Sequence, residues 1–145
     1  MTPYRSILTV CALAAISTSV FAHSGVKDPD VMARMELMSS IGSTTKALGQ
    51  MAKTGQIDPA QVVENANALA AHASRIEAKF AKQATDPKSE SLPAIWTNMD
   101  DFLRIAENLE QAALTLAADP ESLPTAMRAI GKTCGSCHES YRIEK

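Results

Sequence analysis

The segment DPAQVVENANALAAHASRIEAKF, residues 58 to 80, decides the fold class of this chain. Aspartate followed by proline supplies a capping carboxylate and a first helical residue that needs no N–H partner, so a helix is predicted to begin at Asp58 and Pro59. Gln61 stands where it can complete a capping box. Apolar side chains then recur every three or four residues, at Val62, Ala66, Leu69, Ala73, Ile76 and Phe80. This spacing is typical of a helix that buries one face.

Three further segments carry the same signals. Asp28 with Pro29 predicts a second clear start, and the stretches 91–93 and 119–124 predict two more. Breaks are predicted at 54–56, 85–87 and 118–120, and breaks this short place neighbouring helices antiparallel. The apolar positions are Val31, Met35, Met38, Gly42, Thr45, Leu48 and Ala52; then Ile95, Met99, Phe102, Ala106, Leu109, Ala113 and Leu116; then Leu123, Met127, Ile130, Cys134, Cys137 and Tyr141. We therefore predict an all-α fold, an up-down-up-down four-helix bundle.

The size and charge of the chain limit what it can be. It has 145 residues, 46% of them hydrophobic, which suits one small domain. It carries 14 Lys and Arg against 16 Asp and Glu, for a formal charge of -2, and no block of basic residues. A nucleic-acid-binding protein is therefore excluded, because it needs a basic surface to displace counterions from phosphates.

The first 22 residues, MTPYRSILTVCALAAISTSVFA, have the features of a secretory signal peptide. Arg5 precedes an apolar run from Ile7 to Ile16, and small residues flank Phe21 before the expected cleavage after Ala22. The apolar run is too short to cross a bilayer, so no stable membrane anchor is expected after cleavage. We predict a periplasmic protein whose single domain is residues 23–145, with Cys11 lost with the signal.

The predicted core has few large side chains. Alanine occupies many of its positions, and the aromatic residues that remain after cleavage are Phe80, Trp96, Phe102 and Tyr141. Protein interiors pack to a density of about 0.75. Small side chains on facing helices therefore indicate one of two arrangements. Either the helices approach closely, or a bulky apolar guest fills the space between them.

The residues most able to bind a metal or cofactor stand together in the segment Cys134-Gly135-Ser136-Cys137-His138. Two cysteines at i and i+3 and a histidine at i+4 lie on one face of a helix, so two thiols can meet the two vinyl groups of a haem while the imidazole meets its iron. A closed zinc site needs four ligands, and His23 and His72 are far away in sequence. A thioredoxin-like pair belongs beside a βαβ pattern, and none is visible. A chance occurrence on a surface helix is the remaining alternative to covalent haem c.

A haem motif at the end of an exported four-helix chain, from Gly131-Lys132-Thr133 to Tyr141-Arg142, resembles the class II c-type cytochromes, the cytochrome c′ family. A second motif, Arg34-Met35-Glu36-Leu37-Met38, is similar to the family's arginine followed by the residue above the distal haem face. The resemblance implies that His138 is the proximal iron ligand, that Cys134 and Cys137 form the thioethers, and that Met38 is the distal residue. The sequence after Met38 is more similar to the low-spin, methionine-ligated branch.

Spacing alone leaves the distal residue open. At about 1.5 Å per residue, Met32, Met35, Met38 and Met99 all fall in the half of the bundle that holds His138, and helical phase removes only Met32. Arg34 lies one turn before Met38 and Arg142 one turn after His138, so either can meet a haem propionate. Tyr141 is expected to pack near the proximal haem face.

Two functions follow, neither of them enzymatic. If histidine and methionine hold the iron on both faces, the chain carries single electrons between periplasmic redox partners. If Met38 only crowds an open position, the chain binds nitric oxide or carbon monoxide there. The resemblance suggests a homodimer through the first two helices, while the sequence itself leaves monomer and dimer open.

Overall fold

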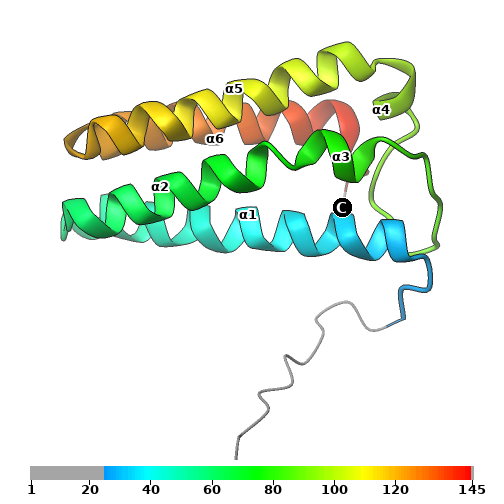
Figure 1. Ribbon diagram of the computed structural model, residues 1–145, viewed down its shortest axis with the longest axis horizontal. Helices are drawn as coiled ribbons and strands as arrows, with labels where there is room; N and C mark the ends of the chain where they lie inside the picture. The colour runs from blue at the N-terminus through cyan, green and yellow to red at the C-terminus, as the bar shows by residue number, and fades with distance from the viewer. Residues whose placement is uncertain (1–24, 145) are drawn as a thin grey trace, which may run out of the picture.

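A computed structural model describes residues 25–144, and in that range four long helical rods run alternately up and down (Figure 1). The elements are α1 (Pro29–Thr54), α2 (Pro59–Ala73), α3 (Ile76–Phe80), α4 (Ala94–Thr97), α5 (Met99–Ala118), the 3-10 turn η1 (Pro120–Ser122) and α6 (Leu123–Tyr141). The antiparallel four-helix bundle predicted from the sequence is confirmed. The predicted signal peptide, with Cys11, lies outside the described residues.

The predicted helix starts at Asp28 and Asp58 are confirmed by their hydrogen bonds. Oδ1 of Asp28 accepts from the backbone N–H groups of Asp30 and Val31 at 2.9 and 3.0 Å. Oδ1 of Asp58 accepts from the N–H of Ala60 at 3.0 Å. The second cap differs in one detail from a capping box, because the Gln61 amide donates to the Asp58 carboxylate, at 3.0 Å, rather than accepting from its backbone.

The predicted second and third helices are each interrupted, which the sequence did not indicate. After α2 the chain tightens, and the N–H of Arg75 donates to the carbonyl of His72, three residues back, at 3.2 Å. The tight turn keeps Ile76 and Phe80 buried, so the apolar pattern continues across the break into α3. The third rod is divided at Asn98, whose backbone leaves the helical region between α4 and α5.

The predicted buried face of the first helix is wrong by about one residue. The face that α1 buries is Val31, Arg34, Leu37, Ile41, Thr44 and Leu48. Four of the predicted positions, Met35, Met38, Gly42 and Thr45, instead line a cavity. The cavity wall on α1 thus combines these half-buried or exposed positions with three of the buried ones, Val31, Arg34 and Ile41, and spacing alone does not distinguish the two sets.

The helices of this bundle differ in how closely they pack. The closest helix pair is α2 with α5, where Ala66, Ala73 and Ala113 are buried. In contrast, α1 and α6 are less closely packed than α1 with α2 or α5 with α6. Among the described residues, no helix is both long enough and apolar enough to cross a membrane.

Replacing Asp58 by alanine is expected to lower the free energy of unfolding by about 1 kcal/mol, because the first N–H groups of α2 lose their acceptor. Asp58→Asn is the matched control, since asparagine caps nearly as well as aspartate. The measurement is urea unfolding of the haem-loaded protein followed by circular dichroism. Equal losses in the two variants would show that the cap does not carry the effect.

Candidate functional site

The cavity occupies the half of the bundle where α6 ends, and its volume is about 890 Å³. This is within the range of roughly 300 to 1,000 Å³ that small-molecule and cofactor sites occupy. Its walls come from α1, α3, α4, α5, α6 and the connection between α3 and α4, and the apolar part is Val31, Ile76, Phe80, Ile95, Phe102, Ile105 and Leu109. Farther along α1 the Met127 methyl packs over Gly49, 3.6 Å from where a Cβ on that glycine would be.

The α6 wall brings together the cysteines and histidine predicted from the sequence. Cys134, Cys137 and His138 all line the cavity, and the two cysteines are half-buried and not joined in a disulfide. Burial raises the pKa of the Cys134 thiol, and burial with the nearby Cys134 and Asp101 raises the pKa of Cys137 to about 11. Before any attachment reaction both groups are therefore uncharged thiols at neutral pH.

The imidazole of His138 is held in the form that binds metals. Burial is the main cause that lowers the pKa of His138, the charge of Arg142 adds to it, and Glu90 acts in the opposite direction. A neutral imidazole keeps one ring nitrogen free to donate its lone pair to a metal ion.

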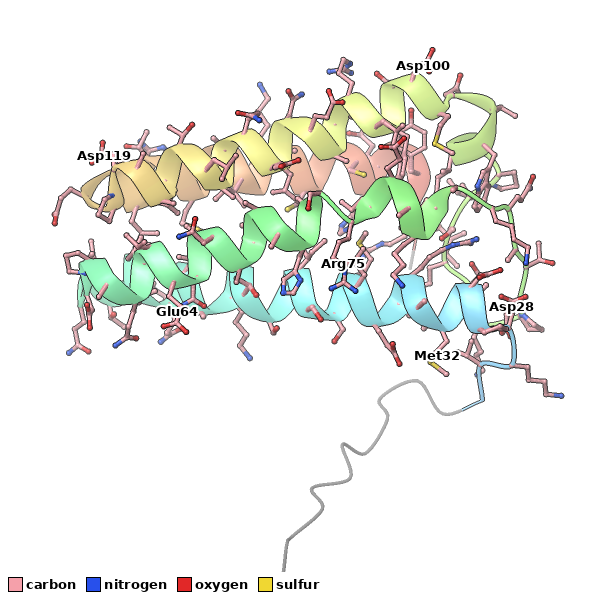
Figure 2. The ribbon with its side chains drawn as sticks, viewed as in Figure 1. Asp28, Met32, Glu64, Arg75, Asp100 and Asp119 are labelled. Carbon is pink, nitrogen blue, oxygen red and sulfur yellow. The ribbon has the colours of Figure 1, made fainter. Side chains whose placement is uncertain are left out.

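Of the four methionines considered for the distal position, two line the cavity. Met35 and Met38 line it, and Figure 2 shows Met32 pointing away from the bundle. Met99 packs against the core and is not part of the cavity wall that the described residues form. One turn after Met38, Gly42 also faces the cavity, and a Cβ built there meets no atom within 4 Å. The wall is therefore hollowed beside Met38.

Arg34 lies inside the fold and lines the cavity. Its side chain is buried, with Nε donating to the carbonyl of Lys79 at 3.1 Å, Nη1 to that of Ala84 at 3.3 Å, and Nη2 to that of Lys82. The guanidinium thus has three backbone partners of its own. The propionate contact suggested for Arg34 stays a prediction.

Tyr141 is the last residue of α6 and Arg142 follows it, and both line the cavity. The buried Tyr141 ring packs edge-on against Phe102, with centroids 5.3 Å apart, and its hydroxyl donates to Asp101 Oδ2 at 2.7 Å. Tyr141 and His138 both line the cavity, and the expectation that Tyr141 packs near the proximal haem face stays a prediction. Arg142 is exposed at the mouth of the cavity, and its own propionate contact also stays a prediction.

Residues 81–93, which we call the strap, were missed as part of the site. The strap joins α3 to α4 around the end of the bundle (Figure 1), and Ser89, Glu90 and Ser91 line the cavity. The N–H of Leu92 donates to the carbonyl of Tyr141 at 3.0 Å, and the N–H of Ile143 donates to that of Glu90 at 2.9 Å. No sequence signal pointed to this pairing, because it joins a loop to the end of a helix.

Thr45 was also missed, since its predicted role was only to fill the core. Its Oγ1 is buried and has no hydrogen-bond partner within residues 25–144, and the residue lines the cavity. A buried hydroxyl without a partner marks a wall made for something that the protein chain itself does not supply.

A haem fits these residues. Its two vinyl groups need two thiols one helical turn apart, its iron needs a neutral imidazole beside them, and its flat apolar ring needs a large apolar cavity. All three are present on one cavity, and the described residues show no other grouping that meets them.

Comparison with known proteins also indicates a haem protein. Residues 30–142 match the family model described as Cytochrome C′. The chain is 35% identical over 119 residues to a cytochrome c-556 of Agrobacterium tumefaciens, covering 78% of this chain and 94% of that protein. It is 41% identical over 120 residues to a cytochrome c-554 of Cereibacter sphaeroides, covering 75% and 77%.

A solved structure shares the fold. It is the nitric oxide complex of a mutant of cytochrome c prime from Alcaligenes xylosoxidans, which matches with a TM-score of 0.70 at 24% identity and covers 80% of this chain and 94% of that one. These comparisons do not single out the low-spin, methionine-ligated branch. The distal ligand therefore stays a prediction.

Replacing Tyr141 by phenylalanine is expected to change how stability depends on alkaline pH. Burial, followed by the hydrogen bond to Asp101, raises the pKa of Tyr141 from 10.0 to about 12. The stability that the neutral phenol contributes is therefore complete below pH 10.0 and is lost as the pH rises to about 12. The wild-type protein should lose more of its urea resistance over this interval than Tyr141→Phe, and parallel curves would contradict the assignment.

Proposed function

Because the chain belongs to the cytochrome c′ family, we propose that it is a periplasmic haem protein that binds a neutral diatomic gas, nitric oxide or carbon monoxide, on the α1 side of its cavity. The cofactor is one covalently bound haem c. When bound, the haem supplies an iron that changes oxidation state and has a coordination position on each face. Cys134 and Cys137 are proposed to form the thioethers, and His138 to hold the iron from the α6 side.

The observation that carries this proposal is the composition of the α1 wall. Met35, Met38 and Gly42 offer an apolar surface with open space beside the glycine, and Ser39, Thr45 and Lys46 are the polar residues near them on this wall. Nitric oxide and carbon monoxide bind ferrous iron without strong help from hydrogen-bond donors, whereas oxygen activation depends on distal polarity. Support also comes from the structural neighbour, which holds nitric oxide in a bundle of the same fold.

A second candidate function is favoured by the position of Met38. Its half-buried side chain lines the cavity from α1 while His138 lines it from α6, so its thioether would be able to hold the haem iron together with His138. With both faces occupied, the protein would belong to the low-spin branch and would pass single electrons between periplasmic redox partners. Neutral methionine raises the reduction potential relative to stronger donors.

The two functions differ in the spectrum of the ferrous protein. For gas binding we expect broad, high-spin bands that sharpen when carbon monoxide or nitric oxide is added. An electron carrier ligated by Met38 instead shows sharp, split low-spin bands that carbon monoxide barely changes. The measurement uses the full-length protein expressed with export, and the second pattern would replace the first proposal with the second.

Met38→Ala gives an independent test. If Met38 only crowds an open position, the gas-free spectrum stays unchanged and the affinity for carbon monoxide rises by roughly tenfold, equal to about 1.4 kcal/mol of relieved crowding. Met127→Ala is the matched control, since Met127 packs over Gly49 at the other end of the bundle. A gas-free spectrum that turns from low-spin to high-spin only in Met38→Ala would identify Met38 as a ligand.

A further inference from the structure

Arg34 is the one charged side chain that the fold buries among residues 25–144, with 2% of its surface exposed. A guanidinium stays protonated at any physiological pH, although burial lowers the pKa of Arg34. Removing such a charge from water is costly, because its hydration must be replaced by protein groups. The fold therefore carries a permanent positive charge inside the end of the bundle that contains the cavity.

The partners of this charge are neutral. The three hydrogen bonds of the guanidinium go to the carbonyls of Lys79, Lys82 and Ala84. The carboxylates of Asp28 and Asp30 act on Arg34 only through longer-range attraction. Asp30 is itself hydrogen-bonded to the ammonium of Lys82, at 2.7 Å. The positive charge of Arg34 is thus solvated by dipoles and is not cancelled by an adjacent anion.

Two aromatic rings fix the position of the guanidinium. Its central carbon lies 5.3 Å from the centre of the Phe80 ring and 4.9 Å from that of Trp96. The Trp96 indole is held in turn by its N–H, which donates to the Phe80 carbonyl at 2.8 Å. Cations are attracted to ring faces at such distances. The charge is therefore fixed in place and does not move out into solvent.

Arg34 and Phe80 both line the cavity. Water does not screen a charge in this position as it screens one on the surface, so the charge acts on whatever occupies the cavity. We propose that Arg34 sets the redox balance of the haem: its buried positive charge stabilises the ferrous state over the ferric state and raises the reduction potential. The couple takes one electron from an external donor, and no bond to Arg34 forms or breaks.

This inference rests on the haem that the family membership implies, and it holds whether the function is gas binding or electron transfer. It differs from the propionate role, in which the charge would be largely neutralised by a carboxylate of the cofactor. It also differs from a purely structural role, in which Arg34 only fastens α3 and the strap to α1 through the three carbonyls.

The test compares midpoint potentials, measured without gas, of the haem-loaded wild-type protein and three Arg34 variants. Arg34→Gln and Arg34→Met remove the charge, while Arg34→Lys keeps it but loses the forked hydrogen bonding. Both neutral variants are expected to lower the midpoint potential, so that the ferrous-to-ferric ratio at a fixed applied potential falls by roughly tenfold, because the haem loses the attraction of a poorly screened unit charge. Arg34→Lys is expected to stay near the wild type.

Arg128→Gln is the matched control, because its guanidinium is exposed near the start of α6, donates to Pro124 and Thr125, and is not part of the cavity lining. It should leave the potential unchanged. Two neutral variants guard against one of them failing to fold, and circular dichroism verifies folding in each sample. An unchanged potential, or an equal fall in the lysine and neutral variants, would overturn the proposal. Gas titration of the same samples tests the proposed function separately, so the failure of one does not imply the failure of the other.

Discussion

The close contact of α2 with α5 is the constraint on which the rest of this bundle depends. Buried alanines at 66, 73 and 113 let these two helices approach, which removes bulk from the centre of the molecule. Met127 packs over Gly49, farther along α1, but nothing comparable stands beside Gly42. The cavity is therefore a consequence of where large side chains are absent, and it opens where α6 presents its cysteines and histidine.

Two helices, α1 and α6, supply the cavity residues on which the proposed function depends. α6 provides the two free thiols and the imidazole, since positions i, i+3 and i+4 share one face of a helix. α1 provides the opposite wall and, within it, the buried charge of Arg34. The strap connects the two sides, through the carbonyls of Lys82 and Ala84 to Arg34 and through backbone hydrogen bonds to the end of α6. A shift of either helix would thus be transmitted to the other wall.

Much of this arrangement could be predicted from local patterns. The caps at Asp28 and Asp58, the helix stop at Gly55 and the face shared by Cys134, Cys137 and His138 each depend on residues within one or two turns. What the sequence could not indicate depends on distant partners. The buried stripe of α1 differs from the predicted one because Arg34, a charged residue that no apolar pattern includes, occupies a buried position with acceptors from residues 79, 82 and 84.

The placement of Arg34 also explains why a four-residue spacing does not imply a shared environment. Arg34 and Met38 are one turn apart and both line the cavity, yet the guanidinium of Arg34 is buried against the rings of Phe80 and Trp96, whereas Met38 is only half-buried. Each residue advances about 100° around a helix, so two residues four apart still differ by about 40°. On a helix at the boundary between packed core and cavity, that difference separates Arg34, which is proposed to act on the haem through its field, from Met38, which is proposed to face it.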